Sequence, residues 1–231
     1  MKLIILAGGL ATRLRPISEK IPKALIEVGG QPFIFWQLQL LKKYGIKDVI
    51  ISCGYLGEMI ENVVGNGNKF GLNINYSYDG PQLLGTGGAI KKIINILPNY
   101  FLIMYGDTIL RVNFKKVQEF YYSNNIENLM VVLNNKNRWA PSNVFYKNNK
   151  VIDYNNKNHH NFQYIDYGLS ILSKKSFFEI NKSKFNLDLV FKNLIKKNQL
   201  SAYKANKRFY EINTITGIRE TEKYLSKYIN H

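Results

Sequence analysis

The chain has 231 residues, 45% of them hydrophobic and 21% charged, a composition that is ordinary for a globular protein and excludes an intrinsically disordered one. The single cysteine, Cys53, excludes an intramolecular disulfide and a zinc site built on paired cysteines, so a reducing cytoplasm is expected. The net charge of +16 would suit a nucleic-acid-binding module, but the lysines are scattered in pairs through a chain rich in Lys, Asn, Ile and Tyr. We therefore interpret the charge as solvated surface that can also steer anionic substrates inward.

The first half of the chain alternates short apolar runs with helical periodicity, which is the pattern of parallel βαβ units. The apolar run 2–6 meets Gly8-Gly9, so it is too short for a signal peptide or a membrane span and is predicted to be a buried strand. A first helix is predicted to begin at Pro32 and to stop at Gly45. The other elements predicted here are strands at 49–53, 73–78 and 100–105 and helices at 56–64 and 88–97.

The second half is less regular, and Asn-rich turns separate some of its predicted strands. Strands are predicted at 129–133, 142–146, 151–154 and 164–172. Helices are predicted at 187–197 and 216–228, and the segment 202–212 between them is expected to return toward the sheet. No internal repeat or linker is visible in the sequence, so we predict one domain over 1–231 with a mixed sheet.

The segment that directly follows the first predicted strand carries the strongest signal for phosphate binding. Gly8 and Gly9 would let backbone N–H groups approach phosphate oxygens beyond the carboxyl end of the strand. The chain has neither the Gly-Lys-Ser/Thr of a P-loop nor a G-x-G-x-x-G, which weakens P-loop and Rossmann dinucleotide interpretations. Arg13 can grip a polyphosphate bidentately, and Lys23 supplies a compact mobile charge. Alone, however, these residues could equally be a turn with surface charges.

Residues 6–23 resemble the L-A-G-G-x-G-T-R-L-x-P…P-K signature of sugar-1-phosphate nucleotidylyltransferases, and residues 28–32, Val-Gly-Gly-Gln-Pro, continue it. Ala11 stands where the signature has glycine, and this G-L-A-T-R-L variant most resembles the D-glycero-D-manno-heptose 1-phosphate guanylyltransferases. Three further segments match in the family's order, so the resemblance spans nearly the whole chain.

Residues 84–89, Leu-Gly-Thr-Gly-Gly-Ala, resemble the family's segment that holds the nucleobase and ribose at the start of a helix, where small residues allow close backbone approach. Uridylyltransferases of this type often read uracil with a Gln two places before the Gly-Thr. This chain has leucine at 83 and 84 and Gln only at 82, which argues against UTP. The nucleotide-binding residues that the resemblance implies are Leu6, Ala7, Gly8, Gly9, Thr12, Arg13, Gly85, Thr86 and Gly87.

The resemblance also implies two metal ligands, both carboxylates. Asp107 follows the predicted strand 100–105 as in the family's strand-Gly-Asp motif, although such an aspartate can also be a turn or helix cap. Glu211 aligns with the acid of a D-x-G-T pattern, with Glu for Asp and Asn213 for Gly. Since its side chain is one methylene longer, Glu211 would need a backbone shift or a different rotamer.

Two more segments imply contacts with the sugar phosphate. Residues 164–168 resemble the family's N-A-G strand, with Asp166 for Asn and with Gly168 retained. Residues 151–157 resemble its F-x-E-K segment and retain Lys157. His159-His160 is no metal pair in our interpretation, because neighbouring strand residues point to opposite faces and no third ligand is near in sequence.

For the fold, the resemblance implies a three-layer Rossmann-like nucleotidyltransferase fold with a central mixed, mostly parallel sheet. Residues 1–112 would mainly bind the nucleotide and residues 113–231 mainly the sugar phosphate. For the function it implies transfer of GMP from GTP to D-glycero-D-manno-heptose 1-phosphate, which gives GDP-heptose and pyrophosphate for surface polysaccharide or capsule synthesis. The catalytic residues would be Arg13, Lys23 and Asp107, and Mg²⁺ the cofactor, held by Asp107 and Glu211.

The expected partners are an NTP, with GTP favoured, and a sugar 1-phosphate, and the chain could form a homo-oligomer. No nucleic acid and no membrane insertion are expected. The first alternative is a cytidylyl- or uridylyltransferase that acts on another sugar phosphate or on phosphocholine. The second alternative is a catalytically silent nucleotide-sensing subunit. It is supported by the departures from the family pattern at Glu211 and Asn213.

Overall fold

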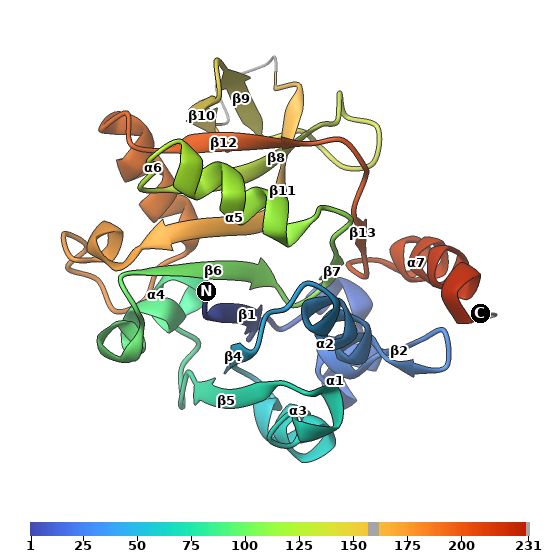
Figure 1. The fold of residues 1–231 in the computed structure, drawn as a ribbon. Coiled ribbons are helices and arrows are strands. Elements are labelled where there is room, and N and C mark those ends of the chain that lie inside the picture. Colours follow the sequence, from blue (N-terminus) through green and yellow to red (C-terminus); the bar gives the residue numbers. More distant parts are fainter. Residues whose placement is uncertain (157–161, 230–231) are drawn as a thin grey trace. The chain divides into compact units, whose positions relative to one another are not determined.

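The computed structural model describes residues 1–156 and 162–229 (Figure 1), in which helices separate the main strands of the first half, whereas consecutive strands follow one another in much of 129–173. By their internal contacts these residues form two compact units that are interleaved along the chain. Unit 1 consists of Met1–Leu83, Met104–Ile109 and Phe209–His231, and unit 2 of Leu84–Ile103 and Leu110–Arg208. Within the described ranges, no helix is both long and apolar enough to cross a membrane.

The sheet of unit 1 has a parallel core. Strand β4 (Asp48–Cys53) pairs in parallel with β1 (Leu3–Ala7) on one side and with β5 (Asn73–Tyr78) on the other. Strands β1 and β4 are almost continuously buried, as expected for parallel strands that are covered on both faces. Their connections carry helices α2 (Phe33–Lys43) and α3 (Gly57–Val64). Because the strands are parallel, the loops that follow β1 and β4 lie at the same edge of the sheet.

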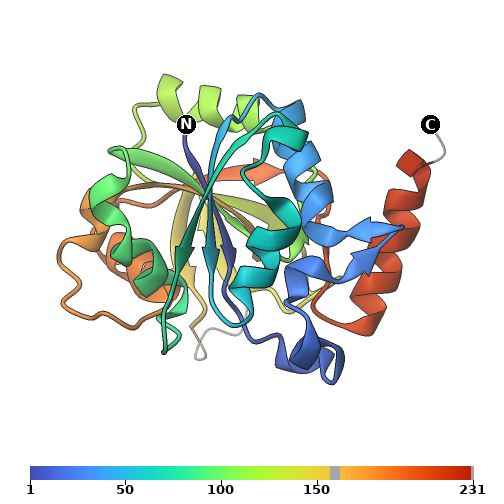
Figure 2. The same cartoon turned by 90° about the horizontal axis from the view of Figure 1, so that it is seen from below.

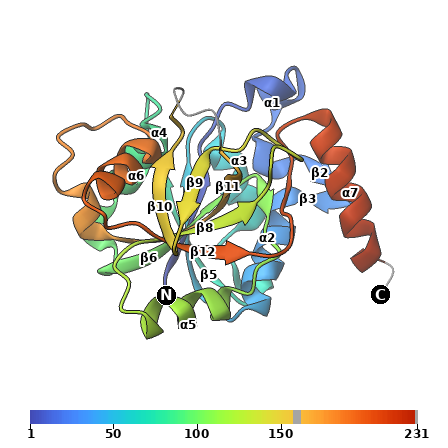
Figure 3. The same ribbon diagram turned by 90° about the horizontal axis from the view of Figure 1, so that it is seen from above.

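A second layer of unit 1 is built from short elements. The hairpin β2 (Glu27–Val28) and β3 (Gln31–Pro32) lies beside the long helix α7 (Ile215–Ile229), as Figures 2 and 3 show. The stacked rings of Tyr210 and Tyr224, 4.3 Å apart, join α7 to β13 (Tyr210–Glu211), which pairs with β7 (Thr108–Ile109). A buried apolar cluster holds these pieces together: Leu14, Ile26, Val28, Phe33, Ile109, Ile212 and Leu225. The remaining short helices of unit 1 are η1 (Thr12–Leu14), α1 (Ile17–Lys20), η2 (Lys23–Leu25) and η3 (Asn68–Phe70).

The sheet of unit 2 is mixed. Strand β8 (Leu129–Asn134) pairs antiparallel with β11 (Tyr164–Ser173) and parallel with β12 (Ser201–Ala205). Strand β10 (Lys150–Tyr154) pairs antiparallel with both β12 and β9 (Val144–Lys147). Strand β6 (Tyr100–Tyr105) passes from unit 2 into unit 1 after residue 103. The helices of unit 2 are α4 (Gly85–Lys92), η4 (Ile94–Ile96), α5 (Phe114–Ser123), η5 (Lys174–Phe177) and α6 (Leu187–Lys196).

Aromatic side chains pack the helices of unit 2 against its sheet. Phe120 of α5 meets Tyr203 of β12 edge to face at 5.3 Å, and Phe191 of α6 meets Tyr154 of β10 in the same way at 5.2 Å. Such pairs contribute roughly 0.5–1.5 kcal/mol beyond the apolar area that they bury.

The predicted elements agree with the structure except in a few places. The helix predicted at 88–97 was wrong in its limits: α4 runs from Gly85 to Lys92 and a separate turn of 3₁₀-helix follows at Ile94–Ile96. Helix α5 was not predicted, although Asn113 caps its first turn and Phe114, Val117 and Tyr121 form its buried stripe. The segment 202–212 was predicted to return to the sheet, and its first residues belong to β12, which pairs with β8.

Candidate functional site

The two glycines that follow β1 have different surroundings. A Cβ atom added at Gly8 would lie 3.1 Å from the backbone nitrogen of Gly54, which follows β4. A side chain at Gly8 would therefore force the two loops apart by a few tenths of an ångström. At Gly9, by contrast, a Cβ atom would meet nothing within 4 Å. Gly9 is the glycine whose backbone has free space beside it, as the approach of a phosphate group requires.

Ala11 adopts the left-handed conformation, with φ of 50°, at the start of η1. Glycine takes this conformation without strain, so the glycine of the family signature suits this position, and alanine costs roughly 1 kcal/mol or more there. Hydrogen bonds to the Ala11 carbonyl hold the turn: Leu14 N and Ser18 Oγ each donate to it at 2.9 Å. The turn leaves Thr12 and Arg13 exposed.

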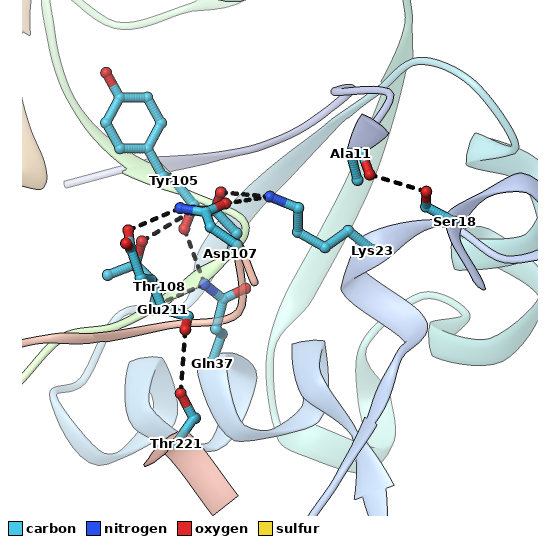
Figure 4. A network of polar contacts seen from close by, with 10 residues as sticks. Ala11, Ser18, Lys23, Gln37, Tyr105, Asp107, Thr108, Glu211 and Thr221 are labelled. Carbon is cyan, nitrogen blue, oxygen red and sulfur yellow. Dashed lines mark hydrogen bonds and ion pairs between the residues drawn. The ribbon is translucent and has the colours of Figure 1, made fainter. Parts of the chain in front are cut away.

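Lys23 and Asp107 form an ion pair in unit 1 (Figure 4). The Lys23 ammonium donates a hydrogen bond of 2.9 Å to Oδ2 of Asp107, and a second one to Oδ1 of Asn213. The other oxygen of Asp107, Oδ1, accepts a hydrogen bond of 2.9 Å from the Thr108 hydroxyl. The side chains of Lys23 and Asp107 keep 18% and 26% of their surface exposed, so the pair can be reached from solvent.

Gln37, which sequence reasoning missed, fixes the turn that carries Asp107. Its fully buried side-chain nitrogen donates to the carbonyls of Tyr105 and Thr108, both at 2.9 Å, on either side of Asp107 (Figure 4). Gly106 N also donates to the Leu6 carbonyl at 2.9 Å, which ties the turn to the end of β1. The available signal was a glutamine on the apolar face of α2, since a buried polar side chain requires partners.

Glu211 reaches the same region from the third chain segment of unit 1. Strand β13 pairs Glu211 with Thr108, and Ile212 N donates to the Asp107 carbonyl at 3.0 Å. The amide nitrogen of Asn213 donates to Oε2 of Glu211 at 2.7 Å. The structure thus brings Lys23, Asp107 and Glu211 together, and their roles in catalysis and metal binding stay predictions.

The electrostatic state of Glu211 reflects these neighbours. Burial raises the pKa of the Glu211 carboxyl, and the nearby Asp107 carboxylate raises it further. The hydrogen bond from Asn213 and the positive charges of Lys23 and Arg13 lower the pKa in part. Arg13 is therefore close enough to Glu211 to act on its charge. Two carboxylates that raise each other's energy favour an added positive charge between them.

The oxygen donors at this position fit a hard divalent cation. Mg²⁺ prefers carboxylate and amide oxygens and is usually held by one or two carboxylates plus substrate phosphates and water. Asp107 and Glu211 offer such a pair, and the mutual repulsion of their charges would be relieved by a dication. Within the part of the chain that the structure describes, no group of three or more His, Cys, Asp or Glu residues could hold a metal alone. A metal ion held by Asp107 and Glu211 would have further coordination positions for water or substrate oxygens.

In unit 2, the small residues at the start of α4 contact the segment before α6. A Cβ atom added at Gly87 would lie 2.3 Å from the Phe185 ring, and one at Gly85 would lie 2.7 Å from the Phe185 carbonyl oxygen. The Thr86 hydroxyl accepts a hydrogen bond of 2.9 Å from Leu187 N and so caps α6. The nucleotide contacts expected of Gly85, Thr86 and Gly87 stay a prediction, but each residue also has a structural function within unit 2.

Asp166 and Gly168 lie in β11, where the register with β8 shifts, and Gly168 has φ of 82°. The Asp166 carboxylate accepts hydrogen bonds from Tyr154 Oη at 3.2 Å and from Gly168 N at 2.9 Å. Burial raises the pKa of Asp166 from 3.8 to about 6, and the Asp188 carboxylate adds to this, while the two hydrogen bonds oppose it. Lys157 lies outside the described residues, as does the pair 159–160.

Comparison with known proteins gives the class. Residues 2–143 match the family model described as Nucleotidyl transferase. A D-glycero-alpha-D-manno-heptose 1-phosphate guanylyltransferase from Aneurinibacillus thermoaerophilus is 32% identical over 234 residues, which cover 99% of this chain and 100% of the relative. An N-acetylmuramate alpha-1-phosphate uridylyltransferase from Neisseria meningitidis serogroup B is 37% identical over 115 residues, 49% of this chain and 50% of the relative. The chain belongs to the nucleotidyl transferase family.

The fold agrees with this membership. A crystal structure of HddC from Yersinia pseudotuberculosis in complex with GMP-PN superposes with a TM-score of 0.81 at 24% identity, over 97% of this chain and 99% of that one. The predicted α/β nucleotidyltransferase fold with a mixed sheet and the predicted enzyme class are confirmed. Nucleotidyltransferases of this family act on a nucleoside triphosphate and a sugar 1-phosphate and generally use a divalent metal ion.

Proposed function

We propose that this chain transfers GMP from GTP to D-glycero-D-manno-heptose 1-phosphate and forms GDP-heptose and pyrophosphate for the synthesis of a surface polysaccharide. The observation that carries the reaction type is the cluster in which Lys23 contacts Asp107 beside Glu211. The choice of substrates is supported by the full-length similarity to a heptose 1-phosphate guanylyltransferase and by the resemblance of the segment around Ala11 to that group of enzymes. We place the reaction in the cytoplasm, where nucleoside triphosphates are available.

In this reaction an oxygen of the sugar 1-phosphate attacks the α-phosphorus of the triphosphate. A new P–O bond forms, the bond between the α-phosphorus and the bridging oxygen breaks, and pyrophosphate leaves. Because the nucleophile is already an anion, the protein needs no general base. It must bring two anions together and stabilise the charge that develops between them.

Two cations of unit 1 suit this task. Arg13 is exposed on η1, where its planar guanidinium can bind the β- and γ-phosphates through two hydrogen bonds. Lys23 has a compact charge on a flexible stem, which suits the α-phosphate and the incoming phosphate. The open space beside Gly9 leaves room for phosphate oxygens near the backbone. The other contacts proposed in this loop are those of Leu6, Ala7, Gly8 and Thr12.

Asp107 and Glu211 would hold Mg²⁺, whose chemistry is to neutralise phosphate oxygens and to polarise the α-phosphate. Gln37 and Thr108 hold Asp107 in place for this purpose. We further propose that Gly85, Thr86 and Gly87 contact the nucleotide and that Lys157, Asp166 and Gly168 contact the sugar phosphate. Residues 1–112 would mainly bind the nucleotide and residues 113–231 the sugar phosphate, as parts of one nucleotidyltransferase domain.

A uridylyltransferase activity is the second candidate, because the relative from Neisseria meningitidis carries that name at 37% identity over 49% of this chain. The leucines at 83 and 84, where uracil-reading enzymes of this type often have glutamine, speak against it.

The test is a substrate panel read out by pyrophosphate release. GTP, UTP, CTP and ATP are each combined with heptose, mannose, glucose and N-acetylmuramate 1-phosphates in the presence of Mg²⁺, with phosphocholine as a further acceptor. We expect the highest kcat/KM for GTP with heptose 1-phosphate. A preference for UTP or CTP would replace the proposal by the corresponding alternative. Absence of product from every pair would favour a nucleotide-sensing subunit.

A further inference from the structure

We infer that Asn213 is a positioning residue that joins the Lys23 ammonium to the Glu211 carboxylate. Its Oδ1 accepts a hydrogen bond from Lys23 Nζ, and its Nδ2 donates to Glu211 Oε2 at 2.7 Å. In the pattern that residues 209–214 resemble, this position is glycine, which has no side chain to make such a bridge. The catalytic consequence of the bridge rests on the proposed function, whereas the bridge itself does not.

The chemistry of the two neighbours selects an amide for this position. An ammonium group only donates hydrogen bonds and an ionised carboxylate only accepts them, so a bridging side chain must have one acceptor and one donor. The amide of asparagine has both and carries no charge. An aspartate at 213 would instead place a third carboxylate beside Glu211 and Asp107, and an alanine would reach neither neighbour.

The backbone fixes the direction of the bridge. Ile212 is fully buried in the apolar cluster of unit 1, and its N–H group donates to the Asp107 carbonyl. The chain bends at Asn213, just after β13, and the hydrogen bonds of its amide to Lys23 and Glu211 place this side chain on the side of the charged groups. The burial of Ile212 and its hydrogen bond to Asp107 thus anchor the backbone between Glu211 and Asn213.

The bridge also explains how a glutamate can stand where the family pattern has aspartate. The side chain of Glu211 has one more rotatable bond, and the hydrogen bond from Asn213 restricts it to one orientation. The same amide gives Lys23 a partner besides Asp107, so the ammonium remains at the site when the Asp107 carboxylate binds a cation. Glu211 and Asn213 thus act as a pair that replaces the aspartate and glycine of the pattern.

The first test probes the bridge without any substrate. The full chain and its Asn213→Ala variant are treated with an amine-acetylating reagent, and the labelling rate of Lys23 relative to exposed Lys20 is measured by peptide mass spectrometry. We expect this ratio to rise about fivefold in Asn213→Ala, because a hydrogen bond to a charged group is lost. The control Asn68→Ala, which changes an exposed asparagine of unit 1, should leave the ratio unchanged. An unchanged ratio in Asn213→Ala, with a thermal unfolding midpoint like that of the parent chain, would overturn the inference.

The second test measures Mn²⁺ binding to the protein alone together with the kinetics of transfer. Loss of a group that orients a metal ligand typically lowers metal affinity or activity about 10–100-fold. We expect Asn213→Gly to weaken Mn²⁺ binding and to lower kcat in this range, with a smaller effect on KM. Adding Glu211→Asp to Asn213→Gly restores the family pattern and should recover part of both losses. If the fold-loss of the double variant equals the product of the fold-losses of Asn213→Gly alone and Glu211→Asp alone, the two residues act independently and the pairing is contradicted. If the parent chain makes no product in the substrate panel, the proposed function fails, and the labelling and Mn²⁺ results still decide the inference.

Discussion

Lys23 and Asp107 are 84 positions apart in the sequence, yet the ammonium nitrogen of one lies 2.9 Å from a carboxylate oxygen of the other. Lys23 begins the short helix η2, and Asp107 lies in the turn between β6 and β7. Their contact depends on the turn that Gln37 clamps and on the loop that runs from Gly8 to η2.

Lys23→Ala and Asp107→Asn should each lower pyrophosphate release by at least about a hundredfold, because each removes a group proposed to stabilise charge at the reacting phosphate. Both residues are partly exposed, so the fold should survive. Circular dichroism and thermal unfolding check this point. Lys20→Ala, an exposed lysine of the same segment, is the matched control and should keep full activity. Turnover near that of the parent chain in either site variant would rule out the assignment.

Gln37→Leu should destabilise unit 1, since it removes the two hydrogen bonds that the Gln37 amide donates to the carbonyls of Tyr105 and Thr108. A hydrogen bond contributes about 0.5–1.5 kcal/mol, so the urea midpoint of unfolding should fall. Gln39→Leu changes an exposed glutamine of the same helix and should have a small effect. Equal midpoints for the two variants would show that the hydrogen bonds donated by Gln37 do not stabilise unit 1.

Gly9→Ala and Gly54→Ala separate ligand access from packing. A Cβ atom at Gly9 would meet nothing within 4 Å, so the unfolding midpoint of Gly9→Ala should equal that of the parent chain. Its KM for the nucleotide should rise if phosphate approaches the backbone there. A Cβ atom at Gly54 would lie 2.4 Å from the Gly8 carbonyl oxygen, so Gly54→Ala should lose stability by about 1–3 kcal/mol. Urea unfolding and initial-rate kinetics on both variants give the answer. A Gly9→Ala variant with unchanged KM would place the phosphates elsewhere.

Asp166 makes stability depend on pH in a defined direction. The folded chain holds this proton up to about pH 6, whereas an unfolded aspartate releases it near 3.8. The stabilisation that results is fully present below about pH 4 and is lost as the pH rises through about 6, with a total of about 3 kcal/mol at most. Urea unfolding at several pH values between 4 and 7 should show this decline, and Asp166→Asn should flatten it. Glu179→Gln, at an exposed carboxylate of unit 2, should retain the decline, and a decline that persists in Asp166→Asn would assign it to other groups.

Several strands could be predicted closely because each has a clear pattern bounded by turn residues: β6 is a continuous apolar run, whereas β5 alternates polar residues with isoleucine and tyrosine. The predicted strand 73–78 coincides with β5, and the strand predicted at 100–105 coincides with β6. The two-residue strands β7 and β13 could not be predicted, because so short a segment has no periodicity and its pairing is set by the tertiary structure.

The site was predictable only where a chemical group matches a family pattern. Lys23, Asp107 and Glu211 were expected together on this ground, and the structure brings them together. Gln37 acts through backbone carbonyls, and such contacts leave no pattern in the sequence beyond a polar residue on an apolar helix face. The contact between Gly87 and Phe185 joins residues far apart in the chain, so the spacing of α4 residues alone could not reveal it.

Unit 1 is assembled from three separate stretches of chain, and each stretch supplies one member of the charged cluster: Lys23 the first, Asp107 the second, and Glu211 with Asn213 the third. During synthesis the last of these stretches leaves the ribosome only after residue 208 has been made. Until then, β7 has no β13 to pair with and the second carboxylate is absent. A nascent chain, or one truncated before residue 209, would therefore hold the lysine and one carboxylate of the cluster without the second, so the proposed metal site can form only once the third stretch has been made.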